Sequence, residues 1–185
     1  MEVVNSWLRC ASPHDGAVVR LLCLPRTGGS AQDFFGWPEK MSGDVHVCAV
    51  QLPGRQERFI EDPIDRMDVL AAEVAALTKE LSDLPLVLFG DCMGALAGFE
   101  VMRTLRRRGE PQPPCLIVAS YPPPDYQRTP PFYHDAPWQS LRTHLELIGG
   151  VTEEALQEEE LFKLLLPMLR ADFAVYETYK YAPEP

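Results

Sequence analysis

Phe-Gly-Asp-Cys-Met-Gly-Ala, residues 89–95, is the stretch that decides the expected fold of this chain, and we call it the elbow. A short apolar run, 84–89, leads into it and predicts a strand that is covered on both faces. Apolar residues at helical spacing follow over 95–105, and a basic run with Gly109 after it predicts the end of that helix. The elbow is therefore predicted to be a sharp turn from a buried strand into a helix.

The composition of the elbow fits such a turn. Gly90 and Gly94 are expected where the backbones of strand and helix come so close that side chains would collide. Cys92 is then expected at the exposed tip of the turn, beside backbone amides at a helix N-terminus that can receive an oxyanion. A cysteine in that position predicts acyl chemistry.

Size and cysteine usage set further bounds. The chain has 185 residues, 46% of them hydrophobic, which suits one well-packed domain over 1–185. Its five cysteines lie mostly in apolar runs, and Cys23, Cys48 and Cys115 especially predict buried free thiols in a reducing compartment. Because the amino-terminal segment lacks the apolar stretch of a signal peptide, we expect a cytoplasmic protein.

Charge and hydropathy exclude two classes of partner. Nowhere do about 18 apolar residues run together, so no membrane association is expected. The formal net charge of -10 argues against nucleic acid, because phosphate binding needs a basic surface. One basic run, 103–108, has two interpretations: a solvated helix end, or a docking patch for an acidic carrier protein.

The rest of the chain alternates strand and helix patterns. Strands are expected over 18–24, 44–50 and 115–119, with an amphipathic helix over 68–81. This alternation predicts an α/β fold with a mainly parallel, doubly wound sheet, in which sites lie at the carboxyl ends of strands. Cys92 follows such an end.

Beyond residue 119 the pattern changes. A proline-rich segment, 120–138, precedes a stretch, 139–181, whose pattern predicts helices. Apolar positions such as Leu141, Leu156 and Phe173 mark the buried faces of these helices, and no further strand is predicted there. We expect a core of about 15–120 and a helical lid of about 121–181 over the carboxyl edge of the sheet. The alternative is that these helices simply cover the sheet.

Four linked motifs carry a family resemblance: 24–30, 50–55, the elbow, and 166–181 with Leu-Arg-Ala-Asp-Phe at 169–173. In these motifs the chain resembles the type II thioesterases, stand-alone α/β-hydrolases that serve polyketide synthases and nonribosomal peptide synthetases. The similarity covers almost the whole chain. It implies the α/β-hydrolase fold, a monomer, and an acyl or peptidyl carrier protein as the partner.

The resemblance also implies a mechanism and its residues. An acyl group moves from the phosphopantetheine thiol of the carrier protein to the elbow nucleophile and then to water, and neither a cofactor nor a metal takes part. Cys92 takes the place of the nucleophile, which in the family is usually serine. The backbone amides of Thr27 and Met93 take the place of the oxyanion hole, where any residue except proline can donate.

The chain also departs from the family pattern. Asp91 and Arg26 stand where the family usually has histidine, and a carboxylate beside the thiol disfavours a thiolate unless it points away. The family continues past the position of Pro185 through strands that supply an acid and then a histidine. We therefore expect the C-terminal strands to be missing from the given chain; alternatively another residue or chain supplies the base, or the protein is not an active hydrolase.

Internal replacements for the base are few. His134 and His144 lie in the expected lid and are candidates for the base, and Asp125, just past the strand at 115–119, is a candidate orienting acid. Surface or structural roles are the commoner use of such residues. His14 and His46 are expected to be remote from the carboxyl edge of the sheet.

Cysteine widens the choice of reaction. An acyl-cysteine thioester keeps more transfer potential than the oxyester of a serine. The leading hypothesis is hydrolysis of carrier-bound acyl thioesters through acyl-Cys92. A Dieckmann-type cyclase or an acyltransferase that uses the same thiol is the alternative, and a non-catalytic carrier-binding protein is the alternative of another class.

Overall fold

In the computed structural model, which describes residues 1–12, 16–148 and 157–184, six strands form one sheet in the order β1-β2-β4-β3-β5-β6. β3, β4, β5 and β6 run parallel, whereas β1 and β2 join the edge antiparallel. The strands are β1 (Glu2–Val3), β2 (Leu8–Cys10), β3 (Val19–Leu24), β4 (Val45–Val50), β5 (Leu86–Asp91) and β6 (Cys115–Ala119). The strands expected at 18–24, 44–50 and 115–119 are confirmed.

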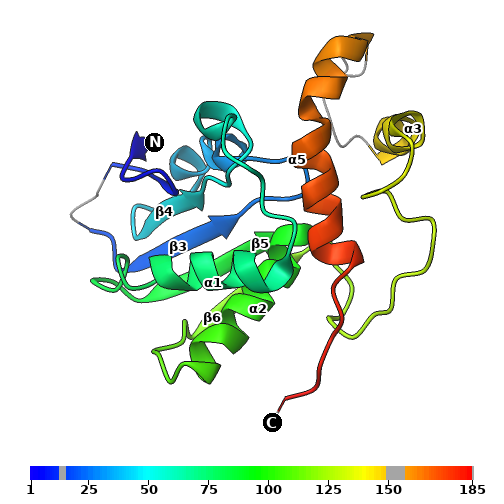
Figure 1. Cartoon of the computed structure of the whole chain (residues 1–185). Coiled ribbons are helices and arrows are strands. Elements are labelled where there is room, and N and C mark those ends of the chain that lie inside the picture. Colours follow the sequence, from blue (N-terminus) through cyan, green and yellow to red (C-terminus); the bar gives the residue numbers. More distant parts are fainter. Residues whose placement is uncertain (13–15, 149–156, 185) are drawn as a thin grey trace.

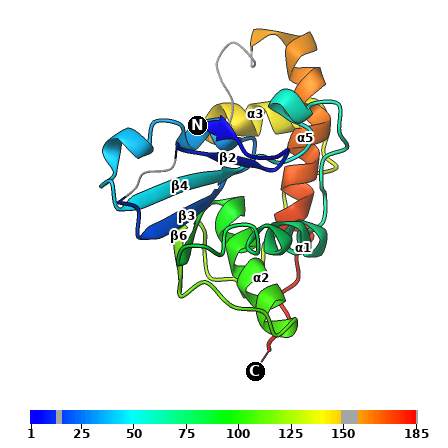
Figure 2. The ribbon, with the colours of Figure 1, turned by 90° about the vertical axis from the view of Figure 1, so that its left-hand side faces the viewer.

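Successive residues of the parallel strands enter different cores because side chains alternate across a sheet. In β3, Leu22 and Leu24 pack in the larger core, and Leu21 and Cys23 pack in a smaller one. The larger core holds the helices α1 (Met67–Leu77) and α2 (Met93–Arg107). Short 3-10 turns, η1 (Ala31–Phe34) and η2 (Pro38–Lys40), lie on the other face, as Figure 2 shows in light blue, and η3 (Gln56–Arg58) follows β4.

Among the described residues, the helices α3 (Trp138–Ile148) and α5 (Glu159–Glu177) follow the sheet. Figure 1 shows α5 beyond the arrowheads of β3 and β5, so it lies over the carboxyl ends of these strands. Leu169 and Phe173 of α5 are buried in the larger core. Leu156, an expected face residue, lies outside the described residues, and the expected division into core and lid stays a prediction.

Several boundaries differ from expectation. α1 ends at Leu77 rather than at residue 81, and turns lead on to β5. β5 begins after Pro85, which cannot donate to a strand ladder, and it continues through Asp91 because β6 still pairs there, with Asp91 opposite Ala119. Among the described residues, no helix combines the length and the apolar character that crossing a membrane requires.

The cysteine prediction is wrong for two of the thiols. β2 places Cys10 opposite Cys48 of β4, and the two form a disulfide. Cys115 is exposed, because β6 is the edge strand of the sheet. Cys23 is a buried free thiol as expected, and burial raises the pKa of that thiol.

Candidate active site

Cys92 sits between β5 and α2 in a backbone conformation that few residues other than glycine adopt. Its φ of 51° and ψ of -116° turn the chain sharply from strand to helix. The Cys92 N–H donates to the carbonyl oxygen of Ala119 at 2.9 Å, which ties the turn to β6. The residue is partly exposed, and so the thiol lies at the carboxyl edge of the sheet as expected.

The glycines of the elbow have the expected purpose. A Cβ atom on Gly90 would lie 2.2 Å from the carbonyl oxygen of Gly94. A Cβ atom on Gly94 would lie 2.3 Å from the carbonyl oxygen of Leu24. Both distances are far below contact, so only glycine lets β3, β5 and α2 approach in this way.

The loop after β3 holds the amides of Gly28 and Gly29 in hydrogen bonds and leaves the Thr27 amide free among the described residues. The Gly28 N–H donates to Asp172 Oδ2 at 2.8 Å, and the Gly29 N–H donates to the Arg26 carbonyl oxygen at 2.9 Å. The Thr27 N–H donates to no acceptor in the described part of the chain. Met93 is the first residue of α2, where an amide has no acceptor within the helix.

A buried ion pair between Arg55 and Asp172 holds the loop after β3 in place. Arg55 Nη2 and Nη1 lie 2.6 and 2.9 Å from Asp172 Oδ1 and Oδ2, and Arg55 Nη1 also donates to the Gly29 carbonyl oxygen at 2.9 Å. The two side chains are 5% and 2% exposed. Both residues lie in motifs of the family resemblance, 50–55 and 166–181, but the sequence alone assigned neither of them a role in the site. The sign that could have found Asp172 is a carboxylate on the otherwise apolar face of α5.

Three polar side chains lie close enough to Cys92 to interact with it electrostatically. The Arg128 guanidinium lies over the rings of Tyr176 and Tyr121, at 4.4 and 5.2 Å from their centroids. Burial raises the pKa of both phenols. Burial lowers the pKa of Arg128, but a hydrogen bond with Tyr121 and negative charge on Tyr121, Tyr176 and Cys92 outweigh it, so that pKa is raised. None of the three was predicted from the sequence.

The candidate bases are engaged elsewhere. His134 Nδ1 lies 2.7 Å from Glu177 Oε2, and the ring of His144 stacks on Tyr133 with centroids 3.9 Å apart. Burial lowers the pKa of His144, against an opposing effect of Glu177. Within the described residues, no hydrogen bond or ring contact joins either histidine to Cys92.

The other acidic and histidine candidates give no replacement. Asp125 is exposed and makes no ion pair with a histidine in the described residues. Asp91 has a buried carboxylate oxygen, Oδ1, that finds no hydrogen-bond partner in the part of the chain that is described. His46 is buried in β4, remote from the site as expected, and His14 lies outside the described residues.

Potential metal ligands gather at one point. Ligand atoms of Cys10, His46 and Cys48 lie within 4.8 Å of one another. The two sulfurs are bonded to each other, His46 Nδ1 accepts from Arg20 Nε at 3.0 Å, and Nε2 lies 2.8 Å from the Ala11 carbonyl oxygen. These donors are therefore already used within the protein.

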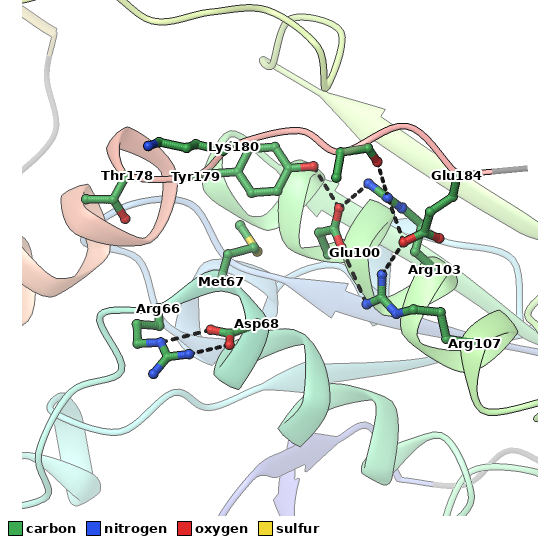
Figure 3. Close-up of a pocket in the computed structure, with 11 residues that line it drawn as sticks. Arg66, Met67, Asp68, Glu100, Arg103, Arg107, Thr178, Tyr179, Lys180 and Glu184 are labelled. Carbon is green, nitrogen blue, oxygen red and sulfur yellow. Dashed lines mark hydrogen bonds and ion pairs between the residues drawn. The ribbon is translucent and has the colours of Figure 1, made fainter.

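A cleft of about 480 Å³ lies between α2, the start of α1 and the segment 178–184. Figure 3 shows Glu100 at its centre, where it accepts from Tyr179 Oη at 2.7 Å and from Arg103 Nη1 at 2.8 Å. Arg103 also meets Glu184 at 2.7 Å, and hydrogen bonds from Arg103 and then Arg107 lower the pKa of Glu184 to about 2. The arginines of this cleft are thus paired with its own carboxylates.

Comparisons with known proteins agree with this geometry. The family model for the thioesterase domain matches residues 19–185. Gramicidin S biosynthesis protein GrsT of Aneurinibacillus migulanus is 35% identical over 178 residues, which are 96% of this chain and 70% of that protein.

Solved structures give the same result. The type II thioesterase BorB from the borrelidin biosynthetic cluster superposes with a TM-score of 0.85 at 33% identity, over 100% of this chain and 75% of that one. RedJ, a thioesterase from the prodiginine biosynthetic pathway in Streptomyces coelicolor, has a TM-score of 0.82 at 38% identity, over 95% and 70%. The α/β-hydrolase fold is confirmed. Because the family match spans nearly the whole chain, and these relatives align over most of their own length, the chain belongs to the thioesterase family.

Proposed function

We propose that this protein hydrolyses acyl thioesters carried on the phosphopantetheine of an acyl or peptidyl carrier protein in polyketide or nonribosomal peptide biosynthesis. The observation that carries the proposal is the placement of Cys92 on a left-handed turn, with a free Thr27 amide on the facing loop. Support also comes from the relatives, since GrsT is a gramicidin S biosynthesis protein and BorB comes from the borrelidin cluster.

In the proposed first step, Cys92 Sγ attacks the carbonyl carbon of the carrier-bound thioester. The amides of Thr27 and Met93 donate to the oxygen that becomes negative, which lowers the barrier because these donors are fixed in advance. The bond from carbon to the phosphopantetheine sulfur breaks, and that sulfur takes up the proton that Cys92 has lost. The products are acyl-Cys92 and a free carrier thiol, and no cofactor is needed.

In the second step, water attacks acyl-Cys92 and releases a free acid and the thiol. This step needs a group to accept a proton from water, and the described histidines make no contact with Cys92. We expect the given chain to acylate faster than it deacylates. The same observation favours a second candidate function, transfer of the acyl group to an amine, hydroxyl or carbanion by a cyclase or acyltransferase.

The test is intact-mass measurement after incubation with an acyl-loaded carrier protein. The wild type is expected to gain the mass of the acyl group and to release free acid, and Cys92→Ala is expected to do neither. Cys115→Ala is the matched control, because Cys115 is also a free and accessible thiol but lies on the edge strand. A cyclised or transferred product favours the second candidate. If no adduct and no turnover appear, both enzymatic functions fail and only the non-catalytic alternative, a carrier-binding protein, is left.

A further inference from the structure

Arg128 is a cation close enough to the proposed nucleophile to interact with it, and it has no carboxylate partner among the described residues. It lies in the proline-rich segment between β6 and α3, half-buried, with its guanidinium against the rings of Tyr176 and Tyr121. Its Nε atom is buried and has no hydrogen-bond partner within the described ranges. In the part of the chain that the structure describes, no carboxylate lies within ion-pair distance of it.

The fully buried arginines of this protein differ from Arg128 in their ion pairs. Each has a carboxylate partner: Arg9 with Glu57, Arg20 with Asp83, Arg55 with Asp172, Arg58 with Glu61, and Arg103 with Glu100. An arginine side chain stays charged at any ordinary pH, and a charge that is withdrawn from water without a partner is unfavourable. Half-buried Arg170 at least donates to the Ala136 carbonyl oxygen at 2.9 Å. Arg128 instead has two phenols that burial keeps neutral.

The position of this cation links it to the acyl site. Tyr121 follows β6 by two residues, and the last residue of that strand, Ala119, accepts the Cys92 N–H at 2.9 Å. Tyr176 belongs to α5 and lies one helical turn from Asp172, which holds the Gly28 amide at 2.8 Å. Arg128 therefore lies between the strand that fixes Cys92 and the helix that fixes the Thr27 loop.

We propose that Arg128 binds a carboxylate on the acyl group that Cys92 receives, so that the preferred substrates are half-thioesters of dicarboxylic acids. The proposal rests on the proposed acylation of Cys92 and names the substrate class of that site. A guanidinium presents paired N–H donors that match a carboxylate, and stacking on aromatic rings holds its plane in place. One hydrogen bond joins Arg128 to the Tyr121 phenol, and its Nε–H stays available among the described residues. A neutral acyl chain would leave the Arg128 cation unpaired.

The test compares acyl groups of equal length with and without a terminal carboxylate. Carrier proteins loaded with succinyl, glutaryl or adipoyl groups are paired with butyryl, pentanoyl and hexanoyl groups, and the rate of Cys92 acylation is followed by intact mass. In at least one pair the wild type is expected to prefer the carboxylate by roughly 10- to 100-fold, the range for a hydrogen-bonded charge. Arg128→Gln is expected to bring that ratio close to one.

Two variants make the test specific. Arg142→Gln, on α3 and paired with Glu146, is the matched control and is expected to keep the wild-type ratio. Arg128→Glu is expected to favour a 4-aminobutyryl group over butyryl, because the sign of the charge is reversed. If the Arg128→Gln variant does not fold, Arg128→Lys serves instead, and it is expected to keep a reduced preference for the carboxylate.

The outcomes separate the two proposals. If the wild type acylates on Cys92 equally fast from acidic and neutral chains, or if Arg128→Gln slows both by the same factor, carboxylate recognition is wrong while the proposed function stands. If no chain of either kind acylates Cys92, the proposed function fails.

Discussion

Replacing Asp172 tests whether the Thr27 loop is held in place by the buried ion pair. The Asp172→Ala change removes the partner of Arg55 and the acceptor of the Gly28 amide. The Asp172 side chain is 2% exposed and the Arg55 side chain is 5% exposed. Removing one partner of a buried pair costs about 3–5 kcal/mol, because the remaining charge stays buried without compensation. For a domain of this size that corresponds to a fall in melting temperature of roughly 6–20 °C.

The measurement is chemical denaturation, with an exposed ion pair as the matched control. Arg66 and Asp68 also pair, but both side chains are 66% exposed, so Asp68→Ala is expected to cost less than about 1 kcal/mol. If Asp172→Ala is no more destabilising than Asp68→Ala, the reasoning about the buried pair is refuted.

A double variant separates stability from positioning. Arg55→Met with Asp172→Leu replaces the pair by apolar side chains, a change that often restores stability. The contacts to Gly28 and to the Gly29 carbonyl oxygen stay lost, so the Thr27 amide is no longer fixed. Acylation of Cys92 is expected to remain about 100-fold slower than in the wild type, the effect of losing one oxyanion donor. If the double variant recovers both the stability and the acylation rate of the wild type, the ion pair does not position the Thr27 amide.

Three further predictions concern other parts of the molecule. Gly94→Ala places a Cβ atom 2.3 Å from a backbone oxygen and is expected to destabilise by about 1–3 kcal/mol or more in denaturation, whereas Gly36→Ala, which meets nothing within 4 Å, is expected to change little. Thiol titration of the unfolded, unreduced protein is expected to count three thiols, because Cys10 and Cys48 are bonded; a count of five before reduction would contradict that bond. Burial lowers the pKa of His144, so the unfolded state binds its proton first and stability is expected to fall as pH drops below about 6.5; His144→Gln should flatten this dependence, and an unchanged pH profile would count against the assignment.

The parallel part of the sheet follows from local patterns. The apolar runs at 18–24, 44–50 and 115–119 are long enough to be recognised as strands, and β6 has the predicted bounds. β1 and β2 were missed because they have two and three residues, too few for a period to show. The disulfide depends on that missed strand, since pairing with β4 is what places Cys10 opposite Cys48.

In the site, too, features that depend on neighbouring residues could be predicted, and features that join distant residues could not. The sharp turn at Cys92 and the close approaches at Gly90 and Gly94 depend on residues that are adjacent in the sequence, and they were predicted; the positive φ of Cys92 is added by the structure. The Arg55–Asp172 pair joins residues 117 positions apart, and no periodic pattern connects such residues. The surroundings of Cys92 likewise come from three separate segments, and only the folded chain brings Arg128 there.

The Glu100 network has a consequence for how substrate reaches Cys92. α5 is fixed at its middle by Asp172 on Arg55, and the chain that leaves it is fixed by Tyr179 on Glu100 and by Arg103 on Glu184. Swinging α5 away would break buried charge contacts at both places, whereas displacing α3 would expose mainly Leu141 and Leu145. The entrance for an acyl chain on its carrier arm is therefore expected on the α3 side, where α3 can be displaced while α5 stays in place.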